Sequence, residues 1–257
     1  MEKHKAKKEK EMDMPSKNDI FQQDLFKTRG KMLAFDIETE EITDFRALQS
    51  AGITCAAALS EDDQAAVWYA GKSEDSYTAK MSQAEAVAMV DYLREKIEGG
   101  YQIYTWNGLA FDLPILYGAS GGDERCKKIA RVHVDMMFHF FCIKGFAISM
   151  EKAAQGMGVA GKPEGMRGSL APQMWQEGQY EQVLAYVAQD ARMTLELAQA
   201  GAQEKGVRWV SRRGSVRRCA LKNGWLPVEQ ALLEPEPDTS WMDDPWPRSR
   251  FTHWLEE

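Results

Sequence analysis

Two carboxylates stand two residues apart at the end of an apolar stretch of the chain. Asp36 and Glu38 lie in the segment MLAFDIET, residues 32–39, which has the pattern of a buried strand. Residues i and i+2 of a strand face the same side, so both carboxylates should project together. Two like charges near a core destabilise a fold unless a cation neutralises them. The pair therefore fits a divalent-metal site, and it fits equally well a strand end that emerges into solvent.

Two further acids occupy positions that suit chemistry. Asp112 follows the turn Asn107-Gly108 at a strand-to-helix junction, where the active sites of α/β sheets gather. An ordinary acid in the first turn of a helix would explain Asp112 as well. Asp190 and Tyr186 are one helical turn apart in YVAQDARMTLEL, on a face that is otherwise apolar. No Lys or Arg lies three or four residues from Asp190, although a salt bridge to a more distant residue remains an alternative.

These four carboxylates come from a strand, the start of a helix and a later helix. Convergence of four acids from such separate elements suits a site for two divalent ions. Hard carboxylate oxygens select Mg²⁺ or Mn²⁺ rather than zinc. Two such ions activate a water and stabilise the leaving oxygen of a phosphodiester. The acids together therefore predict metal-dependent phosphodiester hydrolysis.

The elements that must position these residues follow from the periodicity of the sequence. The alternating or continuous apolar runs predict five strands, and helical spacing between glycine stops predicts four helices. The strands are expected at 32–39, 53–60, 65–71, 101–107 and 130–137, and the helices at 82–99, 111–119, 148–158 and 179–203. The order of these elements predicts an α/β fold with a central five-stranded mixed sheet flanked by helices.

The last fifty residues differ in composition from the rest. Residues 205–222 contain seven basic residues and no acid, and they predict a hairpin that turns at Gly214. A Pro- and Trp-rich acidic segment follows at 235–257, which is expected to pack on the domain without regular structure. The Lys/Glu-rich residues 1–20 are expected to be a disordered basic tail. The chain is thus predicted to consist of this tail, a core domain at 21–204 and a C-terminal extension at 205–257.

Bulk properties exclude several classes of protein. The 257 residues carry a formal net charge of −7, which argues against a protein that coats nucleic acid. No stretch approaches the roughly 18 apolar residues that a membrane helix needs. The N-terminus lacks the apolar region of a secretory signal, and the four cysteines show no C-x-x-C pairing. The expected compartment is the cytoplasm.

Three motifs in this chain resemble those of a known group of nucleases. FDIET, N-x-x-x-F-D and Y-x-x-x-D, in this order, are similar to the three exonuclease motifs of the DEDDy group of DnaQ-like 3′–5′ exonucleases. That group belongs to the RNase H-like superfamily and includes the proofreading domains of family B DNA polymerases. The resemblance runs from Met32 to Gln203. The sister DEDDh group has a histidine where this chain has Ala185, so the tyrosine subtype fits.

The resemblance implies a role for each motif residue. Asp36, Glu38 and Asp190 would hold the first metal ion, and Asp36 would bridge to a second. Asp112 would help to hold the second ion through water, and Tyr186 would orient the attacking water.

Further residues are candidates for binding the substrate. Thr39 and Phe111 are expected to contact the terminal nucleotide, and Asn107 is expected to lie beside it. Lys162 and Arg167, in a Gly-rich loop before the third motif, would either touch phosphates or form a solvated loop.

The resemblance also implies a substrate and a product. The expected activity is removal of nucleoside 5′-monophosphates from the 3′ end of single-stranded nucleic acid, with DNA favoured over RNA. One alternative is an RNA-trimming exonuclease that uses the same site. Another is a non-catalytic nucleic-acid-binding module, or one that docks a protein partner through the C-terminal extension.

Overall fold

A computed structural model describes residues 30–72, 76–161 and 168–256. The chain divides into two units, residues 1–30 and 31–257, and all the elements below belong to the second unit. The tail predicted at residues 1–20 lies outside the described residues.

The core of the second unit is a five-stranded sheet with the order β3-β2-β1-β4-β5. β2 pairs antiparallel with β1 and β3, whereas β4 runs parallel to β1 and to β5. The prediction of an α/β fold with a five-stranded mixed sheet is confirmed. The strands are β1 (Lys31–Thr39), β2 (Ile53–Ser60), β3 (Ala65–Tyr69), β4 (Tyr101–Thr105) and β5 (Val134–Asp135).

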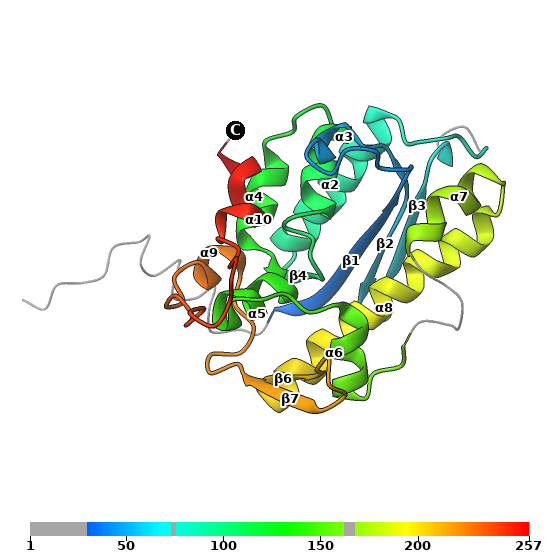
Figure 1. Cartoon of the computed structure of the whole chain (residues 1–257). Helices are drawn as coiled ribbons and strands as arrows, with labels where there is room; N and C mark the ends of the chain where they lie inside the picture. The colour runs from blue at the N-terminus through cyan, green and yellow to red at the C-terminus, as the bar shows by residue number, and fades with distance from the viewer. Residues whose placement is uncertain (1–29, 73–75, 162–167, 257) are drawn as a thin grey trace, which may run out of the picture. The chain divides into compact units, whose positions relative to one another are not determined.

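Helices cover both faces of this sheet, which lies in Figure 1 between α2–α4 on the left and α7–α8 on the right. A capping box between Ser82 and Glu85 fixes the start of α2, and the apolar residues of that helix face the core. α8 is the longest helix and packs across β1 and β2. The helices are α2 (Gln83–Glu98), α3 (Asp112–Ala119), α4 (Arg125–Val132), α5 (Met136–Lys144), α6 (Met150–Met157), α7 (Ala171–Gln176) and α8 (Tyr180–Glu204).

The fifth strand is much shorter than the sequence predicts. Of the residues 130–137, only Val134 and Asp135 form β5. Residues 130–132 belong to α4, and α5 begins at Met136 because the Asp135 side chain accepts a hydrogen bond from the Phe138 amide and caps the helix. The prediction of a full strand over residues 130–137 is therefore wrong. The strand ends at Asp135, and this acid also caps the helix that follows.

After α8 the chain forms the predicted hairpin. β6 (Gly206–Val210) and β7 (Val216–Ala220) pair antiparallel, and Gly214 adopts φ +77° in the turn. A short helix, α9 (Val228–Ala231), follows. The hairpin lies beside α6 at the bottom of Figure 1.

The Pro/Trp-rich segment packs on the core and contains more regular structure than predicted. It ends in α10 (Ser249–Thr252) and a 3₁₀ turn at His253–Leu255. Phe251, Trp254 and Leu255 are buried there, and the Phe251 ring packs against Phe138 and Phe141 of α5. These large apolar side chains stabilise the short helix despite the prolines before it. The expectation that this segment lacks regular structure is wrong for its last residues.

Within the described ranges, no helix is both long enough and apolar enough to cross a membrane. The four cysteines are buried free thiols.

Candidate metal centre

Strand β1 supplies the first two carboxylates from the middle of the sheet. Asp36 and Glu38 alternate along β1 with the buried Phe35 and Ile37, so both project from the face opposite to those apolar side chains. The pairing with β2 shifts register between Glu38 and Thr39, at the carboxyl end of the strand. The core therefore holds β1 in place while the side chains of Asp36 and Glu38 remain partly exposed.

Helix α8 places the third carboxylate against this pair. Asp190 is buried, with 4% of its surface exposed, on the side of α8 that packs on the sheet. One oxygen from each of Asp36, Glu38 and Asp190 lies within 4.8 Å of the other two. The structure thus brings together three of the four predicted metal ligands.

The fourth carboxylate reaches the same pocket from the start of α3. Asp112 is buried and accepts a hydrogen bond of 3.1 Å from the Ile37 amide, so it is tied directly to β1 between the two acids of that strand. Burial raises the pKa of Asp112 to about 7, and the negative charges of Asp135 and Asp190 add to the shift, while the Ile37 amide opposes it. Asp112 lines the pocket but lies outside the cluster of three.

An open pocket of about 450 Å³ contains these side chains. The predicted substrate residues Thr39, Asn107 and Phe111 line it together with the four acids and Tyr186. Lys162 and Arg167 lie outside the described residues. The remaining lining comes from Ile37 of β1, from the segment after β1, from Trp106, and from the 3₁₀ turn before α7 and the start of that helix (Glu40, Glu41, Ile42, Phe45, Gly168, Ser169, Pro172).

The pKa of Tyr186 reflects the negative charge in the pocket. Its side chain is buried, and its hydroxyl forms a hydrogen bond to the Asp190 carboxylate. Burial raises the pKa of Tyr186 far above its usual value, and the negative charges of Asp190, Glu38 and Asp36 raise it further. The tyrosine therefore stays protonated and can act as a hydrogen-bond donor in the pocket.

The donor set fits a hard divalent cation. Three carboxylates offer oxygen ligands alone, and no cysteine or histidine belongs to the cluster. Oxygen ligands of this type favour Mg²⁺ or Mn²⁺. A bound cation would also offset the repulsion among three carboxylates that share one partly buried site.

Sequence reasoning missed Asp135, which positions the loop before Asp112. Its buried carboxylate accepts hydrogen bonds from the amides of Asn107 and Leu109, at 3.0 and 2.9 Å, and from Phe138. Asn107 adopts φ +74°, so the loop needs this support to hold its left-handed turn. The signal that could have found Asp135 is the acid directly before the apolar helix MMFHFFCI, a helix N-cap pattern.

Comparisons with known proteins agree with this geometry. Residues 33–201 match the family model of the RNase H superfamily. The family B DNA polymerase from the hyperthermophilic archaeon Pyrobaculum calidifontis shares the fold, with a TM-score of 0.51 and 20% sequence identity. That match covers 68% of this chain and 25% of the polymerase chain. No curated protein matches the sequence. Since the family model spans well over half of the chain, the protein belongs to the RNase H superfamily.

Proposed function

We propose that the protein is a two-metal-ion 3′–5′ exonuclease of the DEDDy type. It would use Mg²⁺ or Mn²⁺ to hydrolyse the terminal phosphodiester of single-stranded nucleic acid, with DNA favoured over RNA, and release nucleoside 5′-monophosphates. The observation that carries this proposal is the cluster of Asp36, Glu38 and Asp190, with Tyr186 and Asp112 in the same pocket.

Three further facts support the proposal. The family match makes a nucleic-acid substrate the first class to test. The fold shared with a family B DNA polymerase is the reason to favour DNA within that class. The open pocket also suits a strand end, because Phe111 and Thr39 line it together with the acids and could contact a terminal nucleotide.

The chain's own residues would divide the work of the reaction. Asp36, Glu38 and Asp190 would hold one ion, and Asp36 with Asp112 the second. When bound, the ions supply the positive charge that activates water and stabilises the leaving oxygen. Tyr186, protonated at neutral pH, would orient the attacking water through its hydroxyl oxygen. The Ile37 amide holds Asp112 beside these groups.

A time course on 5′-labelled oligonucleotides tests this function. Single- and double-stranded DNA and RNA are incubated with the protein, with Mg²⁺ or with EDTA. We expect a ladder of products that shorten from the 3′ end, more rapidly for single-stranded DNA and only with the metal. Asp36→Ala and Asp190→Ala should abolish the ladder while leaving the thermal unfolding of the protein cooperative. Asp44→Ala, which removes an exposed acid between β1 and β2, serves as the matched control.

The same experiment separates the rival functions. Faster shortening of RNA than of matched DNA would favour the RNA-trimming alternative. Binding of oligonucleotides without any shortening would favour the non-catalytic module. Full activity of Asp36→Ala, or activity in excess EDTA, would rule out the proposed mechanism.

A further inference from the structure

The hairpin β6–β7 is a second feature of the chain that has the chemistry of a nucleic-acid contact. It follows α8 directly and lies beyond residues 33–201, the region of the family match. Its function is therefore not given by membership of the RNase H superfamily.

The hairpin is fixed rigidly to the core. Val207, Trp209 and Cys219 are buried on its inner face, and the Trp209 ring packs against Phe140 at a centroid distance of 5.0 Å. The backbone of β6 approaches α6 so closely at Gly156 that any side chain there would collide with the backbone of Trp209. Because the platform is already ordered, a ligand that binds to it would lose little conformational freedom in the protein.

The exposed surface of the hairpin is strongly basic. Arg208 is neutralised by Glu204 at 2.6 Å, and Arg218 donates to the carbonyl oxygens of Glu204 and Lys205. In the part of the chain that the structure describes, the other cations of the hairpin form no ion pair. Six of the seven basic residues are exposed (Lys205, Arg212, Arg213, Arg217, Arg218, Lys222).

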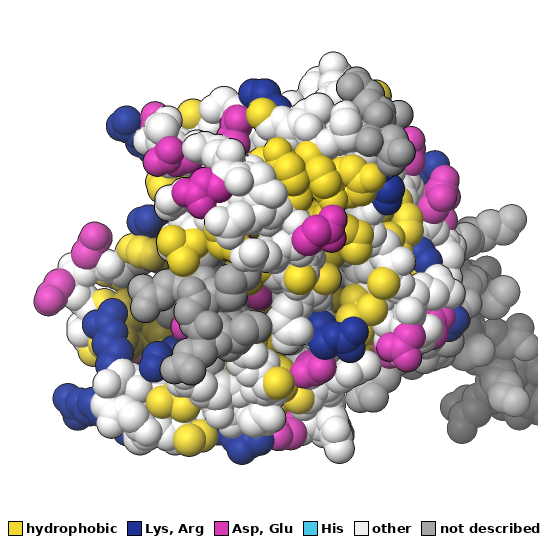
Figure 2. Space-filling view, turned by 90° about the vertical axis from the view of Figure 1, so that its right-hand side faces the viewer, with side chains coloured by type: hydrophobic (Ala, Val, Ile, Leu, Met, Phe, Trp, Pro, Cys, Tyr) yellow, Lys and Arg dark blue, Asp and Glu magenta, His cyan; other side chains and the backbone are white. Residues whose placement is uncertain are grey.

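From this arrangement we propose that the β6–β7 hairpin binds the phosphate backbone of a nucleic-acid strand. Exposed cations held close together without counter-charges raise a local positive potential that attracts a polyanion. Arginine suits phosphate because its planar guanidinium can donate two hydrogen bonds to one phosphate group. Figure 2 shows Lys and Arg side chains along the lower left of the face it presents, at the level where Figure 1 places β6 and β7.

The hairpin lies at a useful distance from the metal centre. Asp190 and the end of α8 at Glu204 are fourteen residues apart, which is about 21 Å along a helix axis at 1.5 Å per residue. A strand with its 3′ end in the pocket would reach the hairpin about six nucleotides upstream, at a rise of 3.4 Å per nucleotide. This placement of the strand rests on the proposed exonuclease function, whereas binding to the hairpin can be tested without cleavage.

An acidic membrane surface is the other polyanion to consider, and the hairpin fits it less well. Interfacial membrane binding combines basic residues with exposed aromatic or other large apolar side chains. Here the one aromatic residue of the two strands, Trp209, is buried at 8% exposure, and Val216 is the large apolar side chain that is exposed. The observations therefore favour a nucleic-acid strand.

The test measures binding of fluorescent oligonucleotides to the full chain in EDTA across a series of salt concentrations. The triple variant Arg212→Gln, Arg213→Gln, Arg217→Gln removes three cations of the hairpin. Each phosphate contact to single-stranded nucleic acid contributes about 0.7 to the slope of log Kd against log salt, so the slope should fall by about two. The affinity for a strand of about twenty nucleotides should fall more than about tenfold at 0.15 M salt.

A control variant makes the result specific. Lys96→Gln, Lys128→Gln, Arg131→Gln removes the same charge from α2 and α4, and it should leave the slope unchanged.

The outcomes for the hairpin and for the exonuclease are distinguishable. An unchanged slope and affinity for the long strand in the hairpin variant would overturn the proposed surface, even if the protein degrades DNA. A reduced slope in a protein that shortens no oligonucleotide would support the surface and contradict the exonuclease. Binding to phosphatidylserine vesicles that depends on the hairpin, with oligonucleotide binding unaffected, would also overturn the proposal.

Discussion

At the scale of single residues, Tyr186 and Asp190 share a helix turn but should contribute differently. The Tyr186 hydroxyl donates to the Asp190 carboxylate and remains protonated because of burial and the surrounding negative charge. Tyr186→Phe removes only this hydroxyl. We expect turnover to fall about 10- to 100-fold, because the attacking water would no longer be oriented. Binding of Mg²⁺ should still raise the melting temperature of this variant, since the carboxylates remain.

Asp190→Asn should lose both the activity and the Mg²⁺-induced rise in melting temperature, because it removes one of the three clustered carboxylates. Tyr180→Phe is the control for the tyrosine, since Tyr180 lies on the same helix but stacks on Tyr77 at 4.1 Å and does not line the pocket. Oligonucleotide shortening and thermal unfolding with and without Mg²⁺ measure both effects. Unchanged turnover in Tyr186→Phe would contradict the role assigned to the hydroxyl.

At the scale of elements, the loop between β4 and α3 is held from two sides. On the side of the sheet, the Asp135 carboxylate accepts hydrogen bonds from the amides of Asn107 and Leu109. On the other side, the indole nitrogen of Trp254 donates to the Leu109 carbonyl oxygen at 2.7 Å. The C-terminal extension therefore contacts the loop that leads into Asp112. It acts on the candidate active site from outside the region that the family model matches.

Trp254→Phe tests whether this contact positions the loop. The variant keeps an aromatic ring but leaves the buried Leu109 carbonyl without its donor, which should cost about 1–3 kcal/mol of unfolding free energy. The turnover number should also fall, because the loop carries Asn107 and leads to Asp112. Trp241→Phe is a matched control, since Trp241 donates to the Asp238 carbonyl oxygen but is 65% exposed. Urea unfolding and single-turnover kinetics give the two quantities, and equal effects of both substitutions would refute the positioning role.

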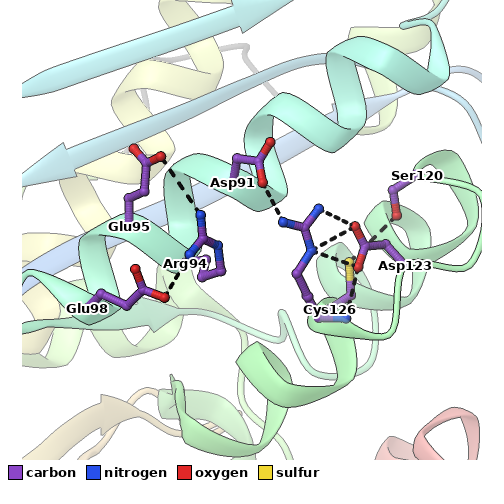
Figure 3. Close-up of polar contacts among 8 residues, drawn as sticks. Asp91, Arg94, Glu95, Glu98, Ser120, Asp123 and Cys126 are labelled. Carbon is purple, nitrogen blue, oxygen red and sulfur yellow. Dashed lines mark hydrogen bonds and ion pairs between the residues drawn. The ribbon is translucent and has the colours of Figure 1, made fainter.

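The elements also show what could be predicted from the sequence. β1 and β2 have strong apolar patterns and lie where those patterns predict them, and the same is true of α8. The prediction succeeds because burial of one or both faces of an element makes apolar residues recur at the spacing of a strand or of a helix. The sequence does not predict α4, although its buried Cys126, Ile129 and Ala130 have helical spacing, since most of its other positions are charged. Its attachment could not be predicted from local sequence: Arg125 pairs with Asp123 and, across to α2, with Asp91 (Figure 3).

For the candidate site, residue types were predictable and contacts were not. Asp36, Glu38 and Asp190 could be chosen because acids in apolar surroundings are costly without a partner. The hydrogen bond from Ile37 to Asp112 joins residues 75 positions apart, and that from Trp254 to Leu109 joins residues 145 apart. Such long-range pairs depend on the packing of whole elements, so a single sequence contains no local signal for them.

At the scale of the whole molecule, the net charge of −7 is a sum over unlike regions. Acids are concentrated in the metal centre and the C-terminal segment, and cations in the hairpin that separates α8 from that segment. A divalent ion would locally offset the negative charge of the carboxylates in the metal centre. The average charge therefore does not argue against a nucleic-acid substrate, as it did when the composition was considered alone.

The stability of the whole molecule should depend on pH through two buried histidines. Burial lowers the pKa of His133 and of His139 to about 4. His133 Nδ1 lies 2.8 Å from the Ala130 carbonyl oxygen, and His139 Nδ1 accepts the Leu226 amide at 3.3 Å. Both rings must be neutral in the folded state, whereas in the unfolded chain they titrate near 6.5. The contribution of the two neutral rings to the free energy of unfolding is therefore fully present above pH 6.5. It is lost as the pH falls toward 4, by up to about 3 kcal/mol for each ring.

The raised pKa values of Asp112 and Asp135, about 7 and about 6, act in the opposite direction. Those acids stabilise the folded state at low pH and lose that contribution as the pH rises through these values.

Comparison of the wild type with a histidine variant separates the two effects, because the acids are common to both proteins. The difference in unfolding free energy between wild type and His133→Gln should shrink as the pH is lowered from 7.5 to 4.5 in urea titrations with EDTA. A constant difference for His133→Gln would mean that this ring has the same pKa in the folded and the unfolded protein, and the burial of the histidine could then not account for acid sensitivity.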